Sequence, residues 1–587
     1  MVKKLMESIR EQKKNSILAM VTISGEVVFE VIIPLLMANL IDYGIDMGDM
    51  GYIVKMGIVL LLSALGQLFC GAISGKFAAI ASSGFARNLR HDMFYKVQNY
   101  SFSNIDKFST ASIVTRLTTD VTNLQNTYQM IIRMAIRSPL MAIFSLVAAF
   151  GIDAKLSLIF LAIIPVLILG LYFIMTRTHP IFERVFRTYD KLNSVVQENL
   201  HGIRVVKSFV REDHENKKFT AISENIYKDF KKAEQQLAWN APLMQLCMYA
   251  AVLLLSWFGA RTIVACGGDA ATGLSTGELL SLLSYATQIL MSLMGLSMIF
   301  VMLTMSRTSG ERVVELLNET PDITTPENAV KSVPDGSIDF EHVQFSYRHG
   351  TEGKPVLSDI NLHIPAGATV GVIGGTGSSQ SSFVQLIPRL YDVDLGAVKV
   401  CGIDVRKYDL DTLRVDVAMV LQKNVLFSGT IKDNLRWGDE NATDEEIRHA
   451  CQLAQADDFI QTFPKGYDTY IEQGGTNVSG GQKQRLCIAR ALLKKPKILI
   501  LDDSTSAVDT RTDALIRGAF AKEIPNTTKI IIAQRIASVQ EADMILVLDD
   551  GKIVSCGTHS ELMQTSPIYR EVYESQTKGD PDNATAS

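Results

Sequence analysis

The sequence predicts a membrane protein of two parts: an all-α domain of six transmembrane helices, followed by an α/β domain with a parallel sheet. Two features of the chain predict this division. Long apolar stretches recur as far as about residue 305, and beyond residue 321 runs typical of strands alternate with runs typical of helices. The composition agrees, because 587 residues are enough for several domains and 47% of them are hydrophobic.

Six segments of the first part are long and apolar enough to cross a bilayer, which a helix does with about 20 residues. These segments are residues 16–41, 53–80, 128–152, 156–175, 243–265 and 279–305. Buried helices of a soluble protein are the alternative, but the fourth segment contains no charged residue. We therefore expect six membrane spans.

The connections between the spans predict the orientation of the chain. Those after the first, third and fifth spans are short and carry acidic residues, whereas those after the second and fourth are long and rich in lysine and arginine. Because positively charged loops stay on the cytoplasmic side, we expect the long connections and both termini in the cytoplasm of a cell-membrane protein. Around residues 103–117 and 211–219, polar residues indicate either short transverse helices that dock on a soluble domain or plain loop tips.

The same patterns predict domain boundaries. We expect a transmembrane domain over residues 1–317, a polar linker with prolines over 318–336, the α/β domain over 337–575 and a polar tail over 576–587. The net charge of −5 says little, but no basic tract resembles a nucleic-acid surface, so we expect no nucleic-acid partner. The seven cysteines are scattered without the spacing of metal ligands.

The first span carries two carboxylates. Glu26 and Glu30 are one helical turn apart and share a face, and Pro34 follows them. Carboxylates inside a membrane are costly and usually face a cavity or a partner. We interpret the pair as a cation-attracting patch in a substrate pathway. A pair at the outer membrane boundary, or a pair hydrogen-bonded between helices, is the alternative.

A phosphate-binding loop with altered key residues follows the apolar strand-like run 368–373. In the frame G-x-x-x-x-G-K-[ST], backbone N–H groups wrap the phosphates, the lysine reaches the β- and γ-phosphates, and the hydroxyl binds magnesium. Here Ser379 stands at the last glycine and Gln380 at the lysine. A lost charge pair near 4 Å is worth roughly 4 kcal/mol at an effective dielectric near 20. The candidate nucleotide-binding residues are Gly374, Gly375, Thr376, Gly377, Ser378, Ser379, Gln380, Ser381 and Ser382.

Two further motifs follow this loop. The apolar run 498–502 indicates a buried strand that ends in Asp502, where a carboxylate can hold magnesium through water. Between the loop and this strand, adjacent glycines open a predicted helix whose N-terminus can bind an anion. The residues of this glycine motif are Ser479, Gly480, Gly481 and Gln482. Each motif alone is weak evidence, but their order and separation are specific for a nucleotide site.

With these motifs in place, the chain resembles a half-transporter of the ATP-binding cassette (ABC) exporter family over essentially its whole length. The glycine motif is close to the LSGGQ signature of that family, with Val478 in place of leucine. The resemblance implies a P-loop nucleotide-binding domain of ABC type, and two such domains that dimerise head to tail. Each ATP then lies between the phosphate loop of one chain and the signature of the other.

The resemblance also assigns roles to residues outside these motifs. Tyr347 matches the aromatic residue that stacks on adenine, and Gln422 matches the loop glutamine that senses magnesium and contacts the membrane part. Residues 506–509 match the loop that crosses between the two nucleotide domains. The magnesium ligands that the resemblance implies are Ser381, Gln422 and Asp502.

Three departures from the family cluster at one site. The first is the Ser379-Gln380 pair, and the second is Asp503, which replaces the glutamate that polarises the attacking water. Aspartate is one methylene shorter, and a general base must come within roughly 2.6–3.2 Å of its target. The third is Gln534, which replaces the switch histidine and cannot carry a proton. The Asp503 and Gln534 combination resembles the degenerate-site subunit of bacterial heterodimeric multidrug exporters, which usually keeps its lysine.

This resemblance implies one subunit of an ATP-driven exporter, in which the chain's own site hydrolyses poorly and its signature completes the partner's hydrolytic site. It implies ATP and Mg²⁺ as cofactors. The expected partners are a second half-transporter, the lipid bilayer and an amphipathic small molecule, whether drug, lipid or peptide-like. The alternatives are a nucleotide-regulated membrane protein without hydrolysis and a catalytically inactivated variant of a transporter.

Overall fold

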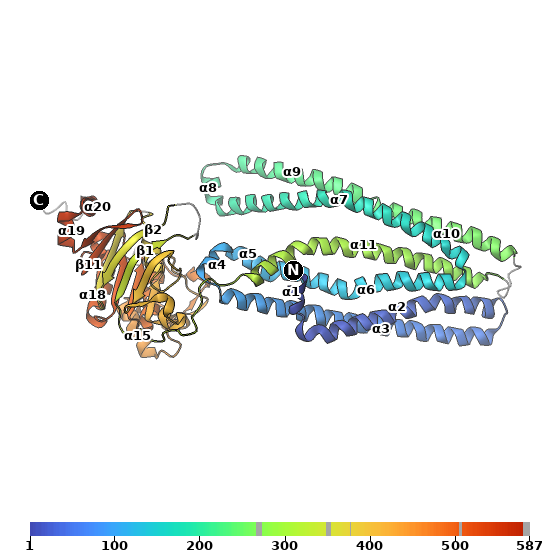
Figure 1. Ribbon diagram of the computed structural model, residues 1–587, viewed down its shortest axis with the longest axis horizontal. Helices are drawn as coiled ribbons and strands as arrows, with labels where there is room; N and C mark the ends of the chain where they lie inside the picture. Colours follow the sequence, from blue (N-terminus) through green and yellow to red (C-terminus); the bar gives the residue numbers. More distant parts are fainter. Residues whose placement is uncertain (266–272, 348–353, 376, 504–507, 579–587) are drawn as a thin grey trace. The chain divides into compact units, whose positions relative to one another are not determined.

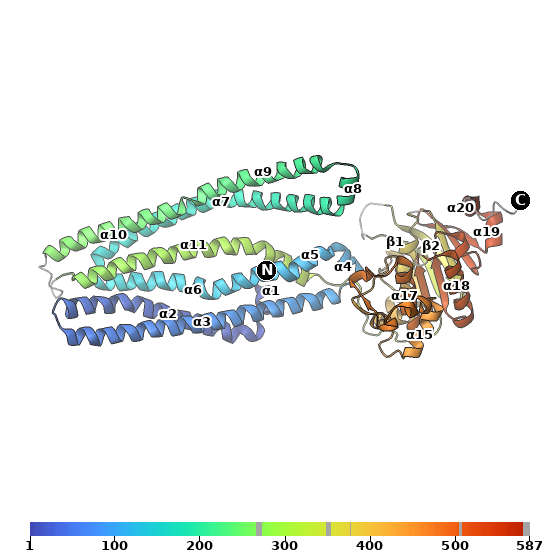
Figure 2. The ribbon, with the colours of Figure 1, turned by 180° about the vertical axis from the view of Figure 1, so that it is seen from behind.

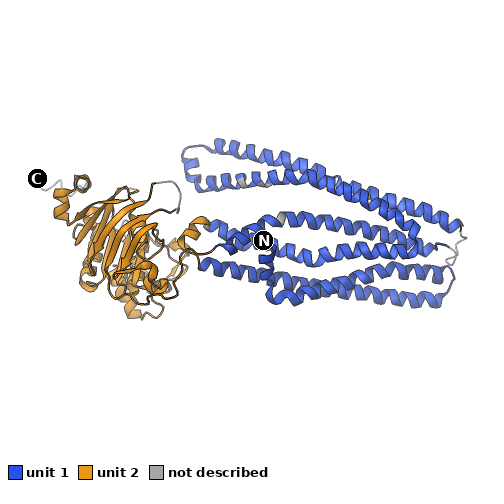
Figure 3. Cartoon of the chain, in the orientation of Figure 1, with its two compact units in different colours: residues 1–98, 110–319 blue, residues 99–109, 320–587 orange. Residues whose placement is uncertain are grey.

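The computed structural model describes residues 1–265, 273–347, 354–375, 377–503 and 508–578. The chain forms two compact units, which Figure 3 shows in different colours. The first comprises residues 1–98 and 110–319, and the second comprises residues 99–109 and 320–587. The main division, after residue 319, falls inside the stretch expected to be a linker.

The first unit is built from helices (Figures 1 and 2). Six helical stretches of the described chain are long and apolar enough to span a membrane: Arg10–Ile45, Met50–Gln98, Thr110–Ile152, Ala154–His201, Glu212–Ala265 and Thr276–Asn318. Each contains one of the six spans expected from the sequence, so the six-helix prediction is confirmed. They are 36 to 54 residues long, which is well beyond the about 20 residues that cross a bilayer.

Small side chains bring the helices of this unit close together. Ala19 of α2 shares a buried cluster with Ala78 and Ala81 of α3, and small residues let helix backbones approach closely in membranes. α2 packs against α3, α6 and α11, while α7 packs against α9 and α10. The helices are α1 (Val2–Glu7), α2 (Lys13–Leu40), α3 (Met50–Gln98), α5 (Thr110–Thr115), α6 (Val121–Ile152), α7 (Ala154–His201), α8 (Ile203–Ser208), α9 (Glu212–Leu237), α10 (Asn240–Ala265) and α11 (Thr276–Asn318).

The second unit is an α/β domain. Its larger sheet has the strand order β12-β11-β3-β10-β9-β6, in which only the edge strand β12 is antiparallel to its neighbour. A smaller antiparallel sheet has the order β2-β1-β4-β5, and β7 pairs with β8. The strands are β1 (Ile338–Phe345), β2 (Leu357–Ile364), β3 (Thr369–Gly374), β4 (Leu395–Val400), β5 (Ile403–Asp404), β6 (Val417–Val420), β7 (Gly429–Thr430), β8 (Tyr470–Ile471), β9 (Ile498–Asp502), β10 (Thr528–Ile532), β11 (Met544–Asp549) and β12 (Lys552–Gly557).

The apolar runs of the sequence form the central strands because both faces of the large sheet are covered. Every residue of β9 is buried, and alternate side chains of a strand point to opposite faces. Ile498 and Ile500 accordingly belong to one core, and Leu499 and Leu501 to the other. The helices of this unit, apart from α4, are α12 (Gln380–Gln385), α13 (Leu410–Asp416), α14 (Ile431–Leu435), α15 (Asp444–Leu453), α16 (Asp457–Thr462), α17 (Gly480–Leu493), α18 (Thr510–Glu523), α19 (His559–Thr565) and α20 (Pro567–Lys578).

The short helix α4 (Phe102–Lys107) belongs to the second unit, although it lies between the second and third spans in sequence. The ring of Phe102 packs edge-on against Tyr391, with centroids 6.1 Å apart. Asn104 Nδ2 donates to the carbonyl oxygen of Thr320 at 3.1 Å. Of the stretch 103–117, the part up to Lys107 thus forms a short helix packed within the α/β unit, whereas Thr110–Thr115 begins the third long helical stretch.

The second polar segment has a different structure. Residues 212–219 begin the long helix α9, and the short helix in this connection is α8, which ends at Ser208. The first turn of α9 carries Glu212, Asp213 and Glu215, and acidic side chains stabilise a helix N-terminus. The polar residues of this segment therefore start a long helix rather than form a short one.

Candidate functional site

The candidate nucleotide site lies at one edge of the larger sheet. The parallel strands β3, β10, β9 and β6 are consecutive neighbours, and the carboxyl ends of parallel strands meet at the same edge. The phosphate loop follows β3, and Gln534 follows β10. Asp502 ends β9, Asp503 comes next, and Gln422 follows β6. The strand order therefore brings together residues that are far apart in the sequence.

The phosphate loop has backbone conformations that favour glycine at two of its residues. Gly377 has φ of +86°, and Ser379 has φ of +69°. The left-handed region costs a residue with a Cβ atom roughly 1–2 kcal/mol. Ser379 is therefore strained at the position where the motif has glycine. Thr376 lies outside the described residues.

Two polar atoms of the loop are buried and have no hydrogen-bond partner in the described protein. They are Nε2 of Gln380 and Oγ of Ser378. An unsatisfied buried donor costs about 1–3 kcal/mol. Phosphate oxygens would accept hydrogen bonds from both groups, so the loop fits a phosphate-bearing ligand such as ATP. Both groups are neutral, so the charge attraction that a lysine supplies is missing.

Ser381 and Asp502 are in direct contact. The Ser381 hydroxyl donates to Asp502 Oδ1 at 2.9 Å. Burial raises the pKa of Asp502, while the Ser381 hydrogen bond opposes this and the nearby charge of Asp503 adds to it. Hydroxyl and carboxylate oxygens are the ligand types that Mg²⁺ takes in phosphate sites. The pair therefore fits a magnesium ion, whose charge would stabilise the ionised carboxylate.

Asp503 is held by two amide side chains. Gln534 Nε2 donates to Asp503 Oδ2 at 2.8 Å, and Gln422 also hydrogen-bonds to this carboxylate. Burial raises the pKa of Asp503, and the two amides lower it in part. A general base needs a free oxygen within reach of its target. Here two amide donors stabilise the ionised carboxylate and so weaken it as a base, and neither amide can accept the proton.

The segment that carries Gln534 is attached to the C-terminal helix α20. Gln576 Nε2 donates to the carbonyl oxygen of Gln534 at 2.8 Å, and Gln576 Oε1 accepts from the N–H of Ile536 at 2.9 Å. The sequence pattern places residue 576 in a polar tail. Neither periodicity nor a motif connects residues about 40 positions apart, so the sequence held no signal for this contact.

Tyr347 lies beside the end of the phosphate loop. Its hydroxyl is 2.8 Å from Ser382 Oγ, and its ring packs edge-on against Tyr391 with centroids 5.1 Å apart. The side chain is 45% exposed, which leaves ring surface for an adenine base to stack on. This position agrees with the adenine-stacking role that the sequence resemblance implies.

The signature residues start helix α17. Ser479 Oγ accepts from the N–H of Gln482 at 3.3 Å, and Gln482 Oε1 accepts from the N–H of Ser479 at 2.9 Å. This reciprocal cap leaves Ser479 and Gly480 exposed. Of the segment 506–509, residues 506 and 507 lie outside the described residues, whereas Asp509 caps α18 by accepting from the N–H of Thr512 at 2.9 Å.

Glu26 and Glu30 share a face of α2, and both pair with an arginine of α6. Arg137 Nη2 lies 2.6 Å from Glu30 Oε2, and Arg137 Nε lies 3.7 Å from Glu26 Oε1. Glu30 is thus hydrogen-bonded between helices, whereas Glu26 makes only a longer ion-pair contact. The sequence analysis missed Arg137, although a cation inside a predicted span is itself a signal for a partner in the membrane.

Comparisons with known proteins agree with this architecture. A family model for the ABC transporter transmembrane region matches residues 16–293, and a model described as ABC transporter matches residues 357–506. The uncharacterized ABC transporter ATP-binding protein YfiB of Bacillus subtilis (strain 168) is 36% identical over 559 residues, covering 95% of this chain and 96% of that protein. The uncharacterized ABC transporter ATP-binding protein MT1311 of Mycobacterium tuberculosis is 35% identical over 556 residues, covering 93% of each chain.

Among solved structures, a bacterial Atm1-family ABC exporter with ATP bound has a similar fold. The TM-score is 0.79, and the match covers 96% of this chain and 98% of that chain at 22% sequence identity. The relatives match along nearly the whole sequence, and both family models fall on the units that the structure shows. The chain therefore belongs to the ABC transporter family.

Proposed function

We propose that the chain is one subunit of a heterodimeric ABC exporter whose own ATP site does not turn over. The observation that carries this proposal is the bond from Gln534 to Oδ2 of Asp503, the carboxylate at the position of the general base. The neutral Gln380 at the lysine position supports it. Ser479 and Gly480 at the start of the capped helix α17 are exposed, so they are available to a second chain.

In the proposed mechanism, the residues of this chain bind nucleotide and hold it. Tyr347 would stack on the base, the donors of Gln380 and Ser378 would bind phosphate oxygens, and Ser381, Gln422 and Asp502 would hold magnesium directly or through water. ATP with magnesium supplies the anhydride bond whose hydrolysis drives transport. Because Asp503 and Gln534 hold each other, these residues would leave a bound nucleotide uncleaved, and this chain's site would then hold the two subunits together.

The other half of the mechanism lies in the partner. Ser479 and the adjacent N–H groups at the start of α17 would bind the phosphates held by the partner's phosphate loop. Hydrolysis there would separate the nucleotide-binding domains. α4 is bonded to the soluble unit, so we infer that it carries this movement to the spans on either side of it. The exported molecule would be amphipathic, and the soluble unit would lie in the cytoplasm.

The test compares the purified chain alone with the chain co-expressed with a half-transporter that has lysine, glutamate and histidine at the three altered positions. We expect little ATPase from the chain alone and full activity from the pair. In the pair, Ser479→Arg in this chain should lower ATPase by about tenfold or more, a barrier change of at least 1.4 kcal/mol. Asp502→Asn in this chain should change ATPase much less.

Two outcomes would contradict the proposal. Strong ATPase of the lone chain, abolished by Asp502→Asn, would show that its own site hydrolyses ATP. An unchanged ATPase of the pair after Ser479→Arg would favour a nucleotide-regulated membrane protein, because a regulatory ligand site does not need the signature.

A further inference from the structure

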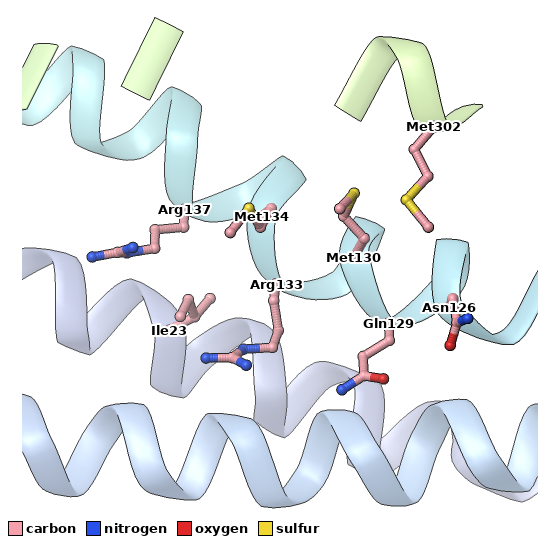
Figure 4. Close-up of a pocket in the computed structure, with 8 residues that line it drawn as sticks. All are labelled: Ile23, Asn126, Gln129, Met130, Arg133, Met134, Arg137 and Met302. Atoms are coloured by element: carbon pink, nitrogen blue, oxygen red, sulfur yellow. The ribbon is translucent and has the colours of Figure 1, made fainter. Parts of the chain in front are cut away.

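A cavity of about 370 Å³ lies in the first unit between α2, α6 and α11. One face of α6 supplies most of its lining, with Met130, Arg133, Met134 and Arg137 at helical spacing. Figure 4 shows these side chains together with Ile23 of α2 and Met302 of α11. Two amide side chains complete the lining. The volume is within the range of small-molecule sites, roughly 300–1,000 Å³.

The charged side chains in this lining are both arginines. Arg137 is paired with Glu26 and Glu30, but neither carboxylate lines the cavity. Glu26 packs toward α3, where a Cβ atom added to Gly71 would lie 2.9 Å from Glu26 Oε2. Glu26 therefore lies on the α3 side of α2, and the formal charges in the cavity lining itself are both positive.

Arg133 forms no ion pair within the part of the chain that the structure describes. It is one turn from Arg137 and lies within the expected span 128–152. An ionisable side chain inside a span is costly and usually serves a function. A guanidinium carries five donors in a planar fork that matches a carboxylate or phosphate group. Arg133 can thus supply a head-group site that Arg137 reinforces.

The rest of the lining fits an apolar chain. Three methionines and an isoleucine surround the arginines, and methionine side chains adapt their shape to varied apolar ligands. Cationic charge beside a flexible apolar wall is complementary to a molecule with an anionic head and a hydrophobic tail. A cationic amphiphile would instead place its charge beside Arg133 and Arg137.

We propose that this cavity binds amphiphiles with a single anionic head group, held by Arg133 and supported by Arg137. The inference rests on the proposed export function for the identity of the cavity as a substrate site. It reverses the charge preference inferred from Glu26 and Glu30 alone, because both carboxylates lie against Arg137 and neither lines the cavity. The same head-group chemistry could come from a free acid or from an anionic bilayer lipid.

The test measures equilibrium binding to the full chain in phosphatidylcholine nanodiscs, without nucleotide. The probes are a fluorescent dodecanoate and the trimethylammonium compound with the same fluorophore and tail. We expect the carboxylate probe to bind more tightly than the cationic probe. Arg133→Gln should weaken the carboxylate probe by about tenfold or more, because a charged hydrogen bond is lost. Arg133→Lys should keep most of the affinity, which shows that the charge matters and that the site still folds.

A matched control is Arg261→Gln on α10, an exposed arginine outside the cavity, which should leave binding unchanged. Equal affinity for the two probes, preference for the cation, or unchanged binding in Arg133→Gln would overturn the proposal. Adding phosphatidylglycerol to the nanodiscs separates the sources: competition assigns the head-group site to bilayer lipid, and no competition assigns it to the free acid. Because binding needs no ATP, selective binding without ATP-driven transport by the pair would refute the export function and leave this site standing.

Discussion

The hydroxyl of Tyr391 donates a hydrogen bond to Asp106 Oδ2 at 2.6 Å, and this bond attaches α4 to the soluble unit. Burial and the nearby Asp106 raise the pKa of Tyr391, so the phenol stays protonated and keeps donating. The same ring packs edge-on against Tyr347, the residue expected to stack on adenine. Tyr391 is thus in contact with both Tyr347 and the helix that leads to the spans.

Replacing Tyr391 by phenylalanine removes this bond and keeps the ring contacts. We expect the amides of residues 102–107 to exchange about fivefold faster, since a hydrogen bond contributes about 1 kcal/mol. Hydrogen–deuterium exchange of the full chain measures this. Tyr470→Phe, at an exposed position of β8, is the control and should leave those amides unchanged. If the amides of residues 102–107 exchange equally fast in Tyr391→Phe and in the unaltered chain, ring packing alone holds α4.

A second attachment of α4 depends on pH. Ser101 and Ser103 at its N-terminus donate to the carboxylate of Asp322. Burial raises the pKa of Asp322, but these and nearby backbone hydrogen bonds outweigh it, and the pKa is lowered overall. A lowered folded-state pKa adds stability above the unfolded pKa, and this stability is lost as the pH falls through the folded value.

We therefore expect Asp322→Asn to lower the melting temperature of the full chain at pH 7. The difference from the unaltered chain should shrink as the pH falls below about 4, where an aspartate with its ordinary pKa gains a proton. Thermal unfolding of both proteins between pH 7 and pH 3 checks this. A difference that stays constant over this range would mean that the Asp322 charge does not hold α4.

Restoring the motif of the phosphate loop should separate binding from hydrolysis. Ser379→Gly combined with Gln380→Lys removes the backbone strain and supplies the missing charge. We expect ATP to bind about 10- to 100-fold more tightly, as charged hydrogen bonds contribute about 1.5–3 kcal/mol. The ATPase of the lone chain should stay low, because Asp503 and Gln534 are unchanged. Calorimetry and phosphate release measure the two quantities.

The control for this variant is Gln564→Lys, which adds the same charge on α19, away from the loop. A gain of rapid hydrolysis in the restored loop would contradict the prediction, because the loop alone would then account for the inactivity. An unchanged ATP affinity would show that Gln380 Nε2 does not face the phosphates.

The hydrogen bonds from Gln576 of α20 to the segment around Gln534 predict a local effect on amide exchange. Gln576→Ala removes the side-chain oxygen that accepts the hydrogen bond from the N–H of Ile536. Because such a bond contributes about 1 kcal/mol, we expect that amide to exchange about fivefold faster. Gln564→Ala, an exposed residue of the preceding helix, should have no effect. If the Ile536 amide stays protected in Gln576→Ala, the segment holds its position without α20.

The contacts of Arg137 with Glu26 and Glu30 predict that changing the two carboxylates can offset the loss of the arginine. Arg137→Met leaves Glu26 and Glu30 without the cation that they contact. We expect the free energy of unfolding to fall by at most about 3 kcal/mol, because Arg137 is partly exposed and its ion pair is therefore only partly buried. Changing both carboxylates to glutamine in the same chain should restore much of the stability. The melting temperature in detergent compares the two variants with the unaltered chain. A triple variant no more stable than Arg137→Met would contradict the pairing.

Most of the fold can be predicted from local patterns in the sequence. The spans, the buried strands and the phosphate loop each depend on residues that are close in sequence, so periodicity and motif spacing predict them. The contacts of Arg137 with Glu30, of Gln576 with Gln534 and of Tyr391 with Asp106 join residues 107, 42 and 285 positions apart. No local pattern contains them, because they exist only once the helices and sheets have packed. The start of α9 is a different case, since its acidic first turn was visible in the sequence.

The membership of α4 in the soluble unit has a consequence for biosynthesis. Residues 99–109 leave the ribosome more than 200 residues before the first residue of the main body of that unit. Domains form largely in the order in which they are synthesised, so α4 has no surface to pack on until the C-terminal half has been made. When the second unit is complete, α4 would pack on a surface that follows it by four membrane spans in the chain. A fragment that begins at residue 320 would lack α4, and Tyr391 would be exposed to water.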